Sequence, residues 1–135
     1  MRVRFLFLLT SLLLAAAPAR AQDTGKPMAN LLKQPAYVSA WKTMMAGAAA
    51  PFWIHEYAKT LDGPPTPVLP VELFGETYLL GFTCKPNACE GNQLFVLFAP
   101  GGRDAWGMLA AAPAISWLGR PSQHIKDAIT GALMK

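Results

Sequence analysis

The sequence has few of the residues that enzymes use for chemistry. Its 135 residues include only two histidines, His55 and His124, and two cysteines, Cys84 and Cys89. It has no nucleophile-elbow motif and no glycine-rich loop of the kind that binds phosphate. The cysteine spacing matches neither a zinc finger nor the two-residue spacing of redox sites. We therefore predict a protein that is not an enzyme, with no catalytic residue, no cofactor and no metal site.

Long hydrophobic runs are missing after the N-terminus. One run extends from residue 5 to 17, interrupted only by Thr10-Ser11, and it follows Arg2 and Arg4. Ala19-Arg20-Ala21 after it is a cleavage motif of the A-x-A type. A core of about 13 residues is shorter than the ~20 that a membrane-spanning helix needs. The pattern predicts a signal peptide over residues 1–21, removed on export, rather than an anchor.

The mature chain also lacks a concentration of positive charge. The full sequence has 12 Lys and Arg against 8 Asp and Glu, but three of the basic residues lie in the signal peptide, which leaves a net charge of +1. No Lys/Arg cluster remains to bind phosphates. We predict no nucleic-acid partner and no membrane association after cleavage. Export also places the two cysteines in an oxidising compartment, where they are expected to pair.

A short segment between the two cysteines is the most informative part of the sequence: Cys84-Lys85-Pro86-Asn87-Ala88-Cys89. A disulfide that closes so small a ring stabilises the fold by about 2 kcal/mol, less than a bridge across a long loop. Pro86 fixes its own φ and restricts Lys85, so the ring is stiff. A stiff cationic tip suits a binding protrusion, because pre-organisation lowers the entropy cost of docking. The alternative is a bridge that only closes a hairpin loop.

The rest of the pattern predicts one α+β domain over residues 22–135, with helices, an antiparallel sheet of about five strands, and a last helix. Residues 23–30 are polar and are expected to form a loose lead-in. The expected elements are helices starting near 35 and 51, strands at 68–73, 77–82, 94–98, 104–110 and 113–119, and a helix after 121.

Tyr37 and Trp41 on the first helix are predicted to be core residues. His55 next to Glu56 is predicted to be a surface or packing residue rather than half of an acid/base pair. The run 94–98 has no polar face, so helices or a second subunit should cover both sides.

Three motifs occur together in the second half of the chain. They are Cys-Lys-Pro-x-x-Cys at 84–89 followed by an apolar strand, Trp-Gly-Met-Leu at 106–109, and Ser-Trp-Leu-Gly at 116–119 before Pro121. Together with the signal peptide and the length, they resemble the Ivy family, the periplasmic inhibitors of vertebrate (C-type) lysozyme. The resemblance is strongest from residue 71 to 119. It implies a periplasmic protein, often a homodimer, with a central antiparallel sheet flanked by helices.

The resemblance also implies how the protein works. The family's disulfide-bridged loop plugs the lysozyme cleft, so Lys85, Pro86, Asn87 and Ala88 would form the inhibitory loop, closed by a Cys84–Cys89 disulfide. The family usually has Cys-Lys-Pro-His-x-Cys, and the histidine meets the two catalytic carboxylates. Here Asn87 stands at that position; an asparagine has two donors and one acceptor but cannot become a cation.

Three functions therefore stay open at this point. The first is inhibition of C-type lysozyme. The second is inhibition of another muramidase or of a lytic transglycosylase by an Ivy-like paralogue. The third is a periplasmic binding module without inhibitory activity.

Overall fold

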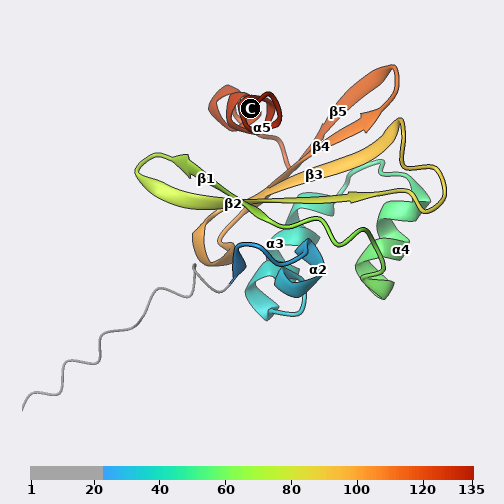
Figure 1. Ribbon diagram of the computed structural model, residues 1–135, viewed down its shortest axis with the longest axis horizontal. Helices are drawn as coiled ribbons and strands as arrows, with labels where there is room; N and C mark the ends of the chain where they lie inside the picture. Colours follow the sequence, from blue (N-terminus) through green and yellow to red (C-terminus); the bar gives the residue numbers. More distant parts are fainter. Residues whose placement is uncertain (1–22) are drawn as a thin grey trace, which may run out of the picture.

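Five antiparallel strands form one sheet with helices on both faces (Figure 1). The computed structural model describes residues 23–135, so the predicted signal peptide lies outside the described residues. The elements in order are α2 (Met28–Leu31), α3 (Pro35–Met45), α4 (Phe52–Thr60), β1 (Leu69–Leu73), β2 (Glu76–Cys84), β3 (Asn92–Phe98), the 3₁₀ turn η1 (Pro100–Gly102), β4 (Ala105–Ala111), β5 (Ala114–Leu118) and α5 (Gln123–Leu133). The strands pair in chain order, β1-β2-β3-β4-β5. The predicted α+β class is confirmed.

The two hairpins that contain β2 place the cysteine loop. Phe74 and Gly75 connect β1 to β2, between the strands predicted at 68–73 and 77–82, and both have positive φ, 53° and 72°, which is typical of a type I′ hairpin turn. At its other end β2 extends as far as Cys84, which pairs with Gln93 of β3. The loop therefore starts directly from a paired residue of the sheet, at the end of β2 opposite the Phe74–Gly75 turn.

Strand β3 has apolar contacts on both of its faces. Val96 and Phe98 belong to a core with helices α2, α3 and α4, whereas Leu97 belongs to a second core with α5. All three side chains are completely buried. Figure 1 shows the same arrangement, with α5 on one face of the sheet and α2 to α4 on the other. The predicted two-sided cover of residues 94–98 is confirmed, and helices of the same chain provide it.

The expected loose lead-in at 23–30 is wrong. Met28 is 1% exposed and packs in the core below the sheet. A Cβ added at Gly81 of β2 would overlap the Met28 side chain, so the glycine makes the space that Met28 fills. Val68 exchanges two backbone hydrogen bonds with this segment, at 3.2 and 2.8 Å. The segment escaped prediction because an isolated apolar residue among polar ones has no periodicity.

Helices α3 and α4 are held against the sheet and against each other by aromatic contacts. In α3, which begins at Pro35, Tyr37 lies 5.4 Å from the ring of Phe98, and Trp41 lies 5.9 Å from Tyr57 of α4. Tyr37, Trp41 and Tyr57 are each at most 6% exposed. The prediction that Tyr37 and Trp41 are core residues is therefore confirmed, and the Trp41–Tyr57 contact positions α4.

Candidate functional site

The cysteine loop is covalently closed and starts from the sheet. Cys84 and Cys89 form a disulfide with their Cα atoms 4.9 Å apart, which confirms the predicted pairing. Cys84 is buried and belongs to β2, whereas Cys89 is exposed. One end of the ring is therefore fixed by strand pairing, and the disulfide transfers that restraint to the other end.

Four hydrogen bonds add to this restraint. The Ala88 amide donates to the Lys85 carbonyl at 3.2 Å, and the Lys85 amide donates to the Asn92 carbonyl at 3.0 Å. The Asn92 amide donates to the Cys89 carbonyl at 3.0 Å, and the Asn92 side chain donates to the Ala88 carbonyl at 3.0 Å. The loop carries its own network of hydrogen bonds, so it is a pre-formed protrusion.

Asn87 lies at the tip of the loop in a left-handed conformation, with φ 60°. It is the third residue of the turn from Lys85 to Ala88, a position where a positive φ favours glycine or asparagine. Histidine is also enriched among non-glycine residues with positive φ. The backbone here therefore accepts the asparagine of this chain and would equally accept the histidine that is usual in the family.

The side chains at the tip point to solvent without internal partners. Lys85, Pro86 and Asn87 are exposed, and Ala88 is half-buried. Within residues 23–135 neither the Lys85 ammonium nor the Asn87 amide makes a hydrogen bond or ion pair. The structure thus brings the four predicted loop residues together as one turn with free polar groups at its end.

A groove runs between this loop and helix α4. It has a volume of about 350 Å³ and is lined by Cys84, Lys85 and Pro86 on the loop side, and by Phe52, Trp53, Glu56, Tyr57, Thr60 and Asp62 on the other. Burial raises the pKa of the Tyr57 phenol to about 12, so this side chain is neutral at physiological pH. The sequence analysis did not identify this wall, because nothing in the spacing of α4 indicates that it lies beside a loop about 30 residues further along the chain.

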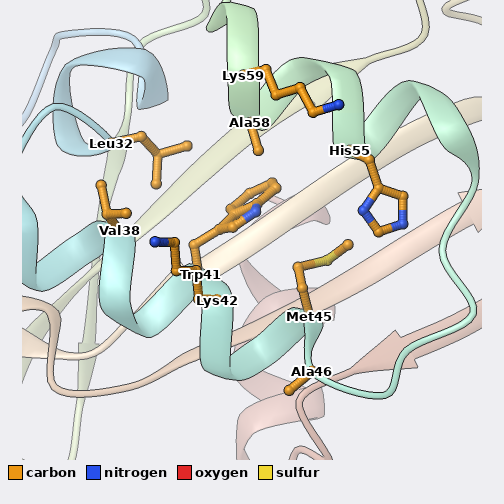
Figure 2. A pocket seen from close by; sticks show the side chains of 9 residues that line it. All are labelled: Leu32, Val38, Trp41, Lys42, Met45, Ala46, His55, Ala58 and Lys59. Carbon is orange, nitrogen blue, oxygen red and sulfur yellow. The ribbon is translucent and has the colours of Figure 1, made fainter.

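A second groove lies between α3 and α4 and has a volume of about 390 Å³. Figure 2 shows the indole of Trp41 between the two helices, with Met45 and His55 to one side and Leu32 and Val38 to the other. His55 is exposed, which agrees with the predicted surface position. Its neighbour in sequence, the Glu56 side chain, lines the other groove.

The second histidine is remote from the cysteine loop. His124 is exposed at the start of α5, 6.0 Å from the ring of Phe74 in the β1–β2 turn. Over residues 23–135 no three His, Cys, Asp or Glu side chains are close enough together to hold a metal ion. In the same part of the chain, no helix has the length and apolar character needed to cross a membrane.

Comparison with known proteins decides the family. A sequence profile described as "Inhibitor of vertebrate lysozyme (Ivy)" matches residues 36–130, which is well over half of the chain. The chain belongs to the Ivy family. The match begins in α3 and continues into α5, so it includes the whole sheet, α4 and the disulfide loop.

Individual relatives agree with this assignment. A Pseudomonas aeruginosa protein named "Inhibitor of vertebrate lysozyme" is 29% identical over 126 residues, covering 82% of this chain and 79% of the relative. An uncharacterized Yersinia pestis protein is 30% identical over 122 residues, covering 80% and 77%. A second, uncharacterized Pseudomonas aeruginosa protein is 27% identical over 139 residues, covering 88% and 87%. The similarity therefore extends over most of this chain and over most of each of these three relatives.

Proposed function

We propose that this protein inhibits C-type lysozyme by inserting the tip of the loop, Lys85, Pro86, Asn87 and Ala88, into the substrate cleft. Membership of the Ivy family and the name of its Pseudomonas aeruginosa relative support this function. The observation that carries the mechanism is the rigid, disulfide-closed turn whose polar tip has no partner in the described chain.

The chemistry of the lysozyme cleft suits such a tip. The cleft holds a protonated glutamic acid and an ionised aspartate that act together on the glycosidic bond. The Asn87 amide can donate to the aspartate with its NH₂ group and accept from the glutamic acid with its oxygen. A side chain that satisfies both carboxyl groups excludes the sugar from the same position. The protein needs no catalytic residue, metal or cofactor of its own for this role.

The proposed setting rests on the N-terminal sequence pattern and on membership of the Ivy family. We propose that residues 1–21 are a cleaved signal peptide, that residues 22–135 act as one domain in the periplasm, and that the domain forms a homodimer. Size measurement of the purified mature protein checks the dimer. N-terminal sequencing of periplasmic material checks the cleavage after Ala21.

The first experiment is a titration of the mature protein against C-type lysozyme in a cell-wall lysis assay. Saturable inhibition near one inhibitor per lysozyme is the expected result. The double variant Cys84→Ser with Cys89→Ser tests the loop, because it keeps the size and polarity of the segment but removes the ring closure. We expect inhibition to be lost while circular dichroism shows an intact sheet. Full inhibition by this variant would overturn the role of the closed loop.

A second target fits one specific feature, the asparagine at position 87. Asn87, unlike a histidine, cannot place a positive charge between two lysozyme carboxyls. A bacterial lytic transglycosylase also has a catalytic carboxylate in a glycan cleft, and a neutral amide can pair with it. Capture of such an enzyme from periplasm, with no binding to C-type lysozyme, would favour this target. A protein that binds neither would be a binding module without inhibitory activity.

A further inference from the structure

Three aromatic side chains line the α4 side of the groove between α4 and the disulfide loop. Phe52, the first residue of α4, is 74% exposed. Trp53 beside it is half-buried, and the buried ring of Tyr57 follows one turn later. An exposed phenylalanine next to a rigid protrusion is the type of side chain that anchors protein interfaces. Figure 1 shows α4 at the end of the sheet from which this loop extends.

Two carboxylates line the same groove. Glu56 comes from the second turn of α4, and Asp62 follows the end of the helix. Asp62 is positioned by the backbone: its amide donates to the Thr60 hydroxyl at 3.2 Å, and Leu61 between them is left-handed, with φ 54°. Within residues 23–135 the Asp62 carboxylate has no hydrogen-bond or ion-pair partner.

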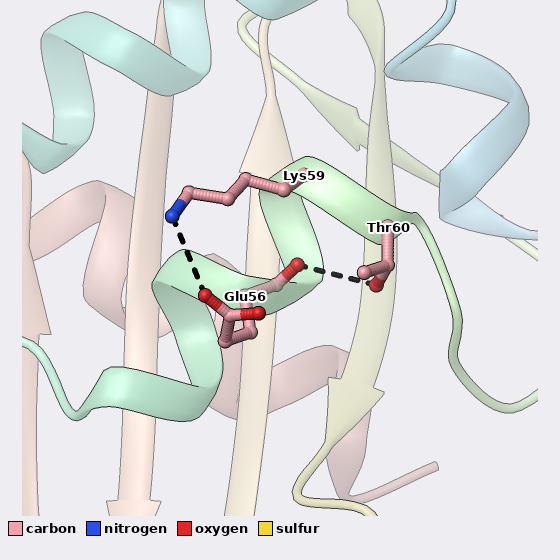
Figure 3. Close-up of polar contacts among 3 residues, drawn as sticks. All are labelled: Glu56, Lys59 and Thr60. Atoms are coloured by element: carbon pink, nitrogen blue, oxygen red, sulfur yellow. Dashed lines mark hydrogen bonds and ion pairs between the residues drawn. The ribbon is translucent and has the colours of Figure 1, made fainter.

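The Glu56 carboxylate has a weak and replaceable partner. Figure 3 shows Lys59 extending back one turn to Glu56, with Nζ and Oε1 3.4 Å apart, while the Thr60 hydroxyl donates to the Glu56 backbone carbonyl. The side chains of this ion pair are 72% and 42% exposed. Exposed pairs of this kind contribute little to stability, and a better-placed cation displaces them readily. Glu56 is therefore available to a partner.

A groove that combines aromatic rings with carboxylates suits a positively charged ligand group. Guanidinium and ammonium groups bind over aromatic faces and form charge-assisted hydrogen bonds with carboxylates. Arginine satisfies both kinds of contact best, because its planar group stacks and bonds at the same time. On the opposite wall, Lys85 also lines the groove; a lysine side chain can pack its aliphatic part against a neighbour while its ammonium stays in water.

We propose that this groove receives an arginine or lysine side chain from the rim of the lysozyme cleft, so that the inhibitor holds its target at two places. The inference rests on the proposed function, because the loop tip must enter the cleft to bring the rim against α4. The proposed contact also explains how this inhibitor could attract a basic target without a negative net charge of its own. C-type lysozymes are strongly basic, and a mature net charge of +1 gives no overall attraction. Glu56 and Asp62 provide a local attraction beside the loop once a cation of the partner replaces Lys59 at Glu56.

The experiment compares variants in the groove with matched variants at the opposite end of β2. In the mature protein, Phe52→Ala removes the most exposed ring of the aromatic wall, and Glu56→Gln combined with Asp62→Asn removes the two charges. Phe74→Ala is the matched control for the ring, because Phe74 is 63% exposed in the β1–β2 turn. Glu72→Gln is the control for charge. Calorimetric titration with C-type lysozyme at low and high salt gives the affinities.

We expect Phe52→Ala to weaken binding on the order of tenfold, as truncation of an anchor does. The double carboxylate variant should weaken it by a similar factor at low salt. That effect should shrink near 1 M salt, where the screening length falls to about 3 Å. The two control variants should bind like the original protein. The substituted side chains are exposed or half-buried, so each variant should stay folded, with at most a small shift in melting temperature; a cooperative melting transition in each excludes misfolding as the cause.

The experiment distinguishes failure of the proposed function from failure of the groove assignment alone. If the original protein neither binds nor inhibits lysozyme, the proposed function and the groove assignment are both overturned. If the original protein inhibits, but Phe52→Ala and the double carboxylate variant bind as tightly as the two controls, the groove assignment alone is overturned.

Discussion

Asn87 is the residue where substitution tests the mechanism most directly. Its side chain is exposed, its φ is 60°, and no group in the described chain bonds to it. Asn87→His introduces the side chain that is usual in the family without moving the backbone, since histidine tolerates this conformation. Asn87→Gly removes the amide and keeps the turn, because glycine adopts positive φ without strain. The affinity of either variant therefore reports on contacts with the target.

The size of the effect follows from the type of hydrogen bond. A neutral bond contributes about 1 kcal/mol and a charge-assisted one about 1.5–3 kcal/mol. Replacing the amide with a protonated imidazole should therefore strengthen binding by about 0.5–2 kcal/mol, a factor of roughly 2 to 30. The gain belongs to the cation, so it should be largest near pH 5 and fall above the usual histidine pKa of about 6.5. Removing the amide in Asn87→Gly should weaken binding about fivefold.

The assay is inhibition of lysozyme-driven lysis, with affinities measured at pH 5 and pH 8. Each variant is compared with the original protein at the same pH, which cancels the titration of lysozyme itself. Asn87→Asp serves as the control of opposite charge and should abolish inhibition, because a carboxylate would face the two lysozyme carboxyls. Equal affinities for the asparagine, histidine and glycine forms at both pH values would refute the reasoning. They would mean that the tip does not contact the catalytic groups.

Three further predictions concern the scaffold. Thr83 is fully buried and its hydroxyl has no partner within residues 23–135, so Thr83→Val should raise the free energy of unfolding by about 1 kcal/mol. Met28→Ala should lower it by about 2–5 kcal/mol, because Met28 fills the space over Gly81. Burial raises the Tyr57 pKa from 10 to about 12, so between these pH values the unfolded chain releases a proton that the folded one keeps. Stability should therefore fall as the pH rises from 10 to 12, and less so in Tyr57→Phe.

Denaturation in urea measures all three. A destabilised Thr83→Val protein would show that the hydroxyl has a favourable partner. An unchanged midpoint for Met28→Ala would mean that the segment before α3 is not part of the cooperative fold. For Tyr57→Phe the comparison is made at pH 9 and pH 11.5, and the same loss of stability in both proteins would contradict the assigned cause.

The sequence predicts the sheet well and its surroundings less well. Turn residues such as Phe74-Gly75 and short apolar runs such as 94–98 mark the strands, and these signals are local. The disulfide is also predictable, because only two cysteines exist and six residues contain both. The position of Met28 over Gly81 and the groove between α4 and the loop depend on contacts between distant segments. No local pattern encodes such contacts, so the acidic and aromatic wall of the groove emerges only from the structure.

The strand order of the sheet has a consequence for how the chain reaches its fold. Every strand pairs with the strand that precedes or follows it in the sequence, so each pairing closes only a short stretch of chain. Short closures have a small entropic cost, and sheets built from local pairings fold faster than those that need distant ones. In a chain exported with its N-terminus leading, as the proposed signal peptide implies, hairpin after hairpin can form before helix α5 follows. The time during which bare strand edges face other unfolded chains is correspondingly short.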